Sequence, residues 1–132
     1  MNNIISIAVL SIIFIAIDSL WLGVIARSFY SKGLGFVMDT LRLFPALLTY
    51  ILMSVGLYVF VYTRFATEGL GTLLLYSFIF GALVYAVYDL TNLSFISKWP
   101  LSIAVVDVLW GGVVSTLSVL VFHYVSKLVG LA

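Results

Sequence analysis

Four long apolar runs constrain this chain more than any other feature of its sequence. They cover residues 4–26, 44–62, 70–92 and 100–125. About 20 helical residues, rising 1.5 Å each, cross the hydrocarbon core of a bilayer. Only 8% of the 132 residues are charged, against about 25% in soluble proteins, so most of the surface must face lipid. The sequence therefore predicts an all-α integral membrane four-helix bundle with short connections, in one domain over residues 1–132.

The connections predict how this bundle is oriented. The first run lacks a basic leader and a cleavage pattern, so we expect it to be a retained helix. The connection over residues 27–43 is rich in aromatic residues and is expected to lie along the membrane interface, broken at Gly33 and Gly35. The side of the first and third connections carries four basic residues, and the other side carries two: Arg27, Lys32, Arg42 and Lys98 against Arg64 and Lys127. The positive-inside rule then puts both termini on the non-cytoplasmic side.

A polar stretch closes the third run, at residues 85–92. Tyr85, Tyr88, Asp89 and Asn92 fall at helical spacings i, i+3, i+4 and i+7, which predicts that they share one face. Polar groups at membrane depth face the inside of a bundle. We therefore take these four residues as a candidate polar site. An alternative is that Asp89 and Asn92 only cap the end of the helix.

A short motif, D-x-L-W-x-G, occurs twice. It covers residues 18–23 in the first run and residues 107–112 in the fourth. Because these helices would run antiparallel, the repeat is compatible with an inverted pseudo-symmetry. Trp21 and Trp110 are candidate site-lining aromatics, with ordinary packing as the alternative. Small residues at Gly111, Gly112 and Ser115 predict a close helix contact.

Three of the five acidic residues are expected at the same depth of the membrane: Asp18, Asp89 and Asp107. A carboxylate at a helix centre costs about 2.5–3.5 kcal/mol on insertion scales. The cost could be offset by retained protons, by a bound cation, or by Arg27 and Lys98 reaching in from the connections. Asp18 and Asp107 could also serve only as hydrogen-bonded contacts between helices. The single histidine, His123, is interpreted as structural.

The same motifs resemble one known family. The D-x-x-W-L-G, Y-D-L-T-N, W-P and D-x-x-W-G patterns, in this order from Asp18 to Gly111, are similar to small bacterial inner-membrane proteins called domain of unknown function 2177. The resemblance covers nearly the whole chain. It implies a four-span protein of the bacterial inner membrane, and it implies no activity.

Three functions fit these residues. The first is proton- or cation-coupled transport of a small solute, or a proton relay, for which a chain this short would have to assemble with further copies. The second is an enzyme acting on a lipid or isoprenoid with a divalent metal, since Asp18, Asp89, Asn92 and Asp107 offer hard oxygen ligands suited to Mg²⁺ or Mn²⁺. The third is a non-catalytic accessory subunit. A net charge of +1 and the absence of cysteine argue against nucleic-acid partners and thiolate zinc sites. Catalytic residues and metal ligands stay unassigned.

Overall fold

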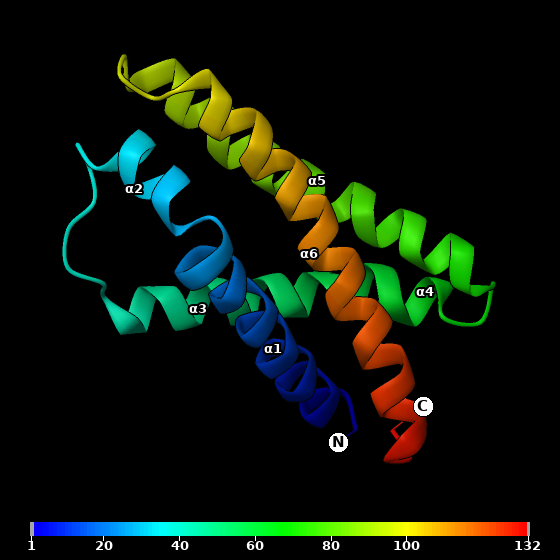
Figure 1. The fold of residues 1–132 in the computed structure, drawn as a ribbon. Coiled ribbons are helices and arrows are strands. Elements are labelled where there is room, and N and C mark those ends of the chain that lie inside the picture. The colour runs from blue at the N-terminus through cyan, green and yellow to red at the C-terminus, as the bar shows by residue number, and fades with distance from the viewer. Residues whose placement is uncertain (1, 132) are drawn as a thin grey trace.

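The computed structural model describes residues 2–131, and these are helical apart from short connections (Figure 1). Within these described residues, four helices are long and apolar enough to cross a membrane: Asn3–Ile25, Leu43–Phe65, Leu70–Phe95 and Leu101–Leu128. Large side chains on the outside are apolar, as a lipid-facing surface requires; Phe95 and Leu128 are each 86% exposed. The predicted all-α membrane bundle is confirmed.

The element bounds differ from the sequence prediction at several ends. In chain order the elements are α1 (Asn2–Leu20), η1 (Trp21–Ile25), α2 (Arg27–Leu34), α3 (Leu43–Gly56), η2 (Leu57–Tyr62), α4 (Thr63–Phe65), α5 (Leu70–Phe95) and α6 (Leu101–Leu128), where η marks a π-helical segment. The second, third and fourth spans each end three residues later than predicted. The expected break at Gly33 was wrong: α2 continues through Gly33, which lies against Ile103, and ends before Gly35.

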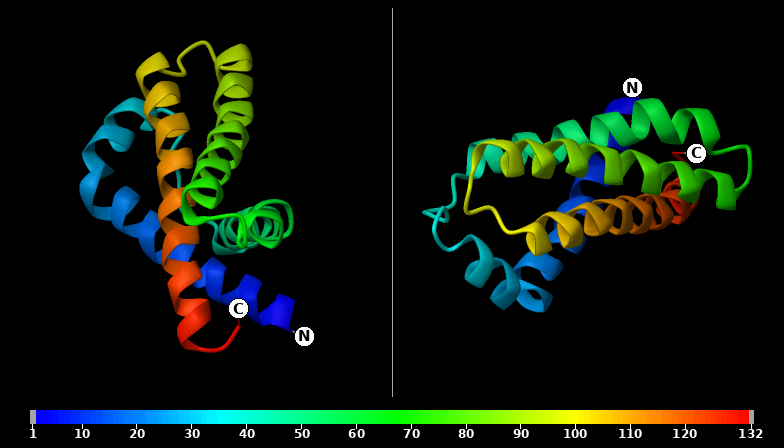
Figure 2. Two further views of the ribbon diagram at one scale, coloured as in Figure 1. Left: turned by 90° about the vertical axis from the view of Figure 1, so that its right-hand side faces the viewer. Right: turned by 90° about the horizontal axis from the view of Figure 1, so that it is seen from above.

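α5 and α6 form an antiparallel hairpin, and this pair has the most extensive helix–helix contact among the described residues (Figure 2). The predicted contact through small residues is confirmed here. A Cβ atom added to Gly81 of α5 would collide with the backbone carbonyl of Gly111 and with the Ser115 side chain. A Cβ on Gly112 would collide with the ring of Phe78. These positions let two helix backbones approach more closely than larger residues would allow.

The other two spans cover one side of this hairpin. α1 packs against both α6 and α3, while the span formed by α3, η2 and α4 meets α5 through η2 and α4. α3 and α5 therefore diverge away from that junction, toward the side of the molecule where α2 lies (Figure 1). The first and last described residues lie together at the opposite end of α1 and α6. This divergence leaves room between α3 and α5.

The glycine contact in the hairpin gives a first prediction. Gly81→Ala should lower the stability of the folded protein by about 1–3 kcal/mol, the usual cost of overpacking, because backbone atoms must move. Gly71→Ala, in the same helix but with open space around the added atom, is the matched control and should leave stability unchanged or raise it. Thermal unfolding of both variants in detergent checks this, and equal melting temperatures would contradict the proposed packing.

Candidate functional site

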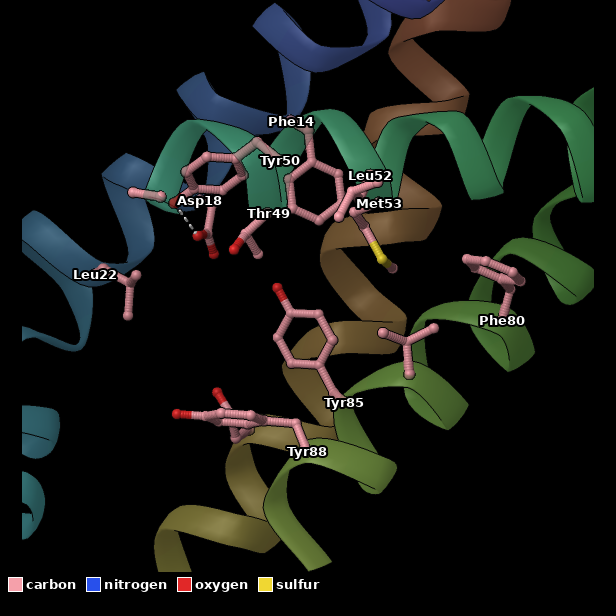
Figure 3. Close-up of a pocket in the computed structure, with 13 residues that line it drawn as sticks. Phe14, Asp18, Leu22, Thr49, Tyr50, Leu52, Met53, Phe80, Tyr85 and Tyr88 are labelled. Carbon is pink, nitrogen blue, oxygen red and sulfur yellow. Dashed lines mark hydrogen bonds between the residues drawn. The ribbon is translucent and has the colours of Figure 1, made fainter. Parts of the chain in front are cut away.

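A chamber of about 540 Å³ lies in the space between α3 and α5, with α1 and α6 completing its wall (Figure 3). This size falls within the range of small-molecule sites, about 300–1,000 Å³. Most of the wall is apolar, and the polar groups in it are carboxyls, phenols and one hydroxyl. The lining residues are Phe14, Asp18, Leu22, Ala46, Thr49, Tyr50, Leu52, Met53, Phe80, Val84, Tyr85, Tyr88 and Asp107.

Asp18, near the end of α1, is buried and doubly hydrogen-bonded. Its Oδ2 accepts a hydrogen bond from the Tyr50 hydroxyl at 2.6 Å (Figure 3), and its Oδ1 accepts one from Trp110 Nε1 at 2.8 Å. Tyr50 comes from α3 and Trp110 from α6, so this one carboxyl links three spans. Buried carboxylates need such donors to offset the loss of water.

Asp107, in the first turns of α6, takes its donor from outside the four spans. The hydroxyl of Tyr30 in α2 donates to Asp107 Oδ1 at 2.9 Å. The same oxygen of Tyr30 accepts a hydrogen bond from Trp21 Nε1 at 3.4 Å. Burial raises the pKa of Tyr30, so the phenol stays protonated and remains a donor to the carboxyl.

The tryptophan in each copy of the repeated motif is hydrogen-bonded, directly or through Tyr30, to the aspartate of the other copy. Trp110 of the second copy donates to Asp18 of the first, and Trp21 of the first copy reaches Asp107 of the second through Tyr30. The two indole rings also stack, with centroids 4.3 Å apart and planes 11° apart. Trp21 begins the π-helical segment η1, and such segments are frequent at functional sites. The two motif copies, residues 18–23 and 107–112, therefore hold the antiparallel helices together by two sets of hydrogen bonds and one indole stack, a contact we call the clasp.

Asp89 belongs to a different face of α5 from the chamber. It is fully buried, and its Oδ1 accepts a hydrogen bond from Trp99 Nε1 at 3.3 Å. Its Oδ2 has no donor among the described residues, and the Asp107 carboxyl lies within hydrogen-bonding reach. Asp89 also lines a separate apolar groove of about 350 Å³ between α5 and α6.

The structure thus divides the predicted polar site. Tyr85 and Tyr88 line the chamber, whereas Asp89 lines the separate groove between α5 and α6. The Asp89 side chain is buried between α5 and α6. Asn92 is half-buried beside Tyr88, and its backbone carbonyl accepts a hydrogen bond from the Ile96 N–H at the end of α5.

The donors to the three acids are aromatic side chains, which were not predicted from the sequence. Arg27 and Lys98 were expected as possible partners, but the hydrogen bonds to these carboxyls come from Tyr30, Tyr50 and the tryptophans. Trp99, the donor to Asp89, is itself buried, with 7% of its surface exposed. A phenol in the middle of an apolar stretch, eight residues before the next tyrosine of the second span, was the available signal for Tyr50. Within the described residues, no group of three or more His, Cys, Asp or Glu side chains is placed to hold a metal ion.

Comparison with known proteins agrees with the resemblance noted in the sequence. The model of the family described as predicted membrane protein (DUF2177) matches residues 3–123. The chain belongs to this family. No curated protein and no solved structure matches the chain. Membership supports a multi-pass membrane protein and assigns no reaction or ligand.

The stacked indoles give a spectroscopic prediction. Two parallel indoles in contact couple their excited states, so far-ultraviolet circular dichroism should contain an exciton couplet. Trp21→Phe and Trp110→Phe should each abolish it. Trp99→Phe is the matched control, since Trp99, the third of the three tryptophans, meets the ring of Tyr88 edge-on. A couplet that survives in Trp21→Phe would contradict the clasp.

Proposed function

We propose that this protein binds amphipathic organic cations in the chamber and exchanges them for a proton, as part of coupled transport across the bacterial inner membrane. The observation that carries the proposal is that two carboxyls, the buried one of Asp18 and the half-buried one of Asp107, line one chamber whose wall is otherwise mostly apolar. On the orientation favoured by the basic residues, this chamber lies at the cytoplasmic side.

The charge of the chamber favours a cation. The carboxyls of Asp18 and Asp107 receive hydrogen bonds from neutral phenols and indoles, which stabilise a carboxylate without cancelling its charge. The lining residues include no lysine or arginine among the described residues. In a low-dielectric surrounding, an uncompensated carboxylate attracts a cation strongly.

The wall of the chamber favours an organic cation over a metal ion. Rings of Phe14, Phe80, Tyr85 and Tyr88 offer apolar surface and faces for cation–π contact. Mg²⁺ and Ca²⁺ require about six or more oxygen ligands, some of which are usually carboxylates held close together. The chamber fits an aromatic or alkyl ammonium or phosphonium group better.

The same lining argues against the enzyme hypothesis in its lipid-phosphate form. Phosphate groups are bound by arginine, lysine, metal ions or helix N-termini, whereas this chamber presents carboxyls. A lipid or isoprenoid phosphate would meet like charge there. An accessory role is compatible with the fold, but it does not explain a chamber of this size lined by the carboxyls of Asp18 and Asp107.

The contact between Asp89 and Asp107 supplies the exchangeable proton. Two carboxyl groups within hydrogen-bonding reach need one proton between them, since two carboxylates repel and neither is a donor. A cation that binds at Asp107 stabilises its carboxylate and competes with that proton. Binding should therefore release a proton to the solvent, and it should weaken as the pH falls.

Tetraphenylphosphonium, a rigid aromatic cation, tests the proposal directly. We expect it to bind the purified protein and to release about one proton per cation, as one site exchanging one charge requires. Titration calorimetry in two buffers with different ionisation enthalpies measures both quantities. Tetraphenylborate has the same shape and the opposite charge, so it should bind far more weakly. Equal binding of the two ions would show an apolar site that does not select for positive charge, and it would overturn the proposal.

Asp107→Asn is the matching variant. Its amide oxygen can still accept from Tyr30, so the fold should persist, but the charge is lost. Tetraphenylphosphonium should bind at least about tenfold more weakly, the lower end of measured charge-pair couplings, and proton release should vanish. Asp39→Asn is the control, because Asp39 is exposed in the connection before α3. If both variants bind like the wild type, Asp107 is not the cation site.

A further inference from the structure

A second polar cluster lies at the far end of the bundle from the chamber. The Tyr62 hydroxyl is 3.3 Å from His123 Nδ1 and 3.2 Å from Ser126 Oγ. Beside it, Tyr58 donates to the exposed Asn3 side chain at 3.0 Å, and the rings of Tyr58 and Tyr62 stack. The cluster therefore reaches from a buried imidazole to the surface near the N-terminus.

Three serine hydroxyls lie between this cluster and the chamber, at mid-depth in the bundle. Ser54 of α3 and Ser115 and Ser118 of α6 are fully buried. Their Oγ atoms have no hydrogen-bond partner among the described residues. Serines in helices usually satisfy themselves by bonding to the carbonyl four residues earlier, as Ser77 does with Leu73. Buried hydroxyls left over in this way are typical positions for internal water.

These groups follow one face of α6. Asp107, Ser115, Ser118 and Ser126 lie within about 100° of one another on the helix, at 100° per residue. The 19 positions from Asp107 to Ser126 span roughly 28 Å, close to the thickness of the hydrocarbon core. The base of the Tyr85 ring lies against Gly111, and the Tyr85 hydroxyl points into the chamber that Asp107 lines (Figure 3). Phe122, on the same face, packs edge-on to Tyr62 of the far-end cluster.

We infer that this face of α6 is a proton path that joins the acidic chamber to the His123–Tyr62 cluster at the opposite side of the membrane. Hydroxyls, water and imidazole pass protons along hydrogen bonds, and chains of polar residues inside a bundle are typical of such paths. The path deepens the proposed function, because it would carry the proton that the cation displaces. Its test does not involve the cation.

The two ends of the path are surrounded by different titratable groups. At the chamber, Asp107 faces Asp18 of α1, Tyr30 of α2, and Asp89, Tyr85 and Tyr88 of α5. At the far end, His123 faces Tyr62 of η2, and Tyr124 and Lys127 of its own helix. No acidic residue is among the far-end neighbours in the described residues, so the imidazole is the group there that can accept and pass a proton near neutral pH.

Proton flux into vesicles tests the inference. Purified protein is reconstituted in liposomes that hold a pH-sensitive dye, and a potassium gradient with valinomycin drives protons inward. We expect uptake above that of protein-free vesicles, and we expect Ser118→Ala to lower it by about tenfold, the effect of losing one hydrogen-bonding step of the barrier. Ser77→Ala is the matched control, because Ser77 is equally buried but already bonded to Leu73. Equal flux in the two variants, or none above empty vesicles, would overturn the path.

The absence of cysteine from the natural sequence allows a second, nearly isosteric test. In Ser118→Cys, a thiol on a hydrated path binds Ag⁺, so micromolar Ag⁺ should abolish the flux. The wild type and Ser77→Cys should be unaffected, since the wild type has no thiol and the latter's thiol lies in packed protein. Flux through Ser118→Cys that resists Ag⁺ would contradict a hydrated path there. Flux without tetraphenylphosphonium binding would sink the proposed function alone, and binding without flux would sink only the path.

Discussion

The constraint on which this structure depends is that carboxyl groups inside a bilayer must find hydrogen-bond donors within the protein. Asp18 finds one on α3 and one on α6, and Asp107 finds one on α2. Each of these bonds joins elements that no short connection brings together. The acids therefore determine how α1, α2 and α3 sit on the α5–α6 hairpin at this end of the molecule. Removing a donor would leave a buried acceptor unpaired, which typically costs more than the bond itself contributes.

The choice of neutral donors has a consequence for chemistry. A lysine or arginine would have cancelled the charge of each acid and closed the site as a salt bridge. Phenols and indoles instead stabilise the carboxylate and leave its charge available. Because the donors Tyr30, Tyr50 and Trp110 are themselves held by packing or by further hydrogen bonds, the acids are positioned before any ligand arrives. Preorganised groups of this kind bind with less loss of entropy.

The sequence predicts those features of this fold that depend on local pattern. Hydropathy locates the four spans, and the small residues Gly111, Gly112 and Ser115 predict the close helix pair. The partners of the acids could not be predicted, since Tyr30 and Asp107 are 77 residues apart and Trp110 and Asp18 are 92 apart. Helical spacing alone also placed Asp89 on the face of Tyr85. Asp89 lies at the edge of that face, and its side chain packs between α5 and α6 instead of lining the chamber.

The two ends of the bundle differ in a way that accounts for the chamber. At the end near η2 and α4, the ring of Phe80 lies over Gly56, and Phe65 stacks on Tyr76 with centroids 4.0 Å apart. These contacts fix α3 to α5 there, and the two helices separate toward α2. The volume of the chamber is therefore set by the angle at which they leave this junction. Since Phe80 also lines the chamber, the residue that fixes the junction is also part of the site, and a change in one must alter the other.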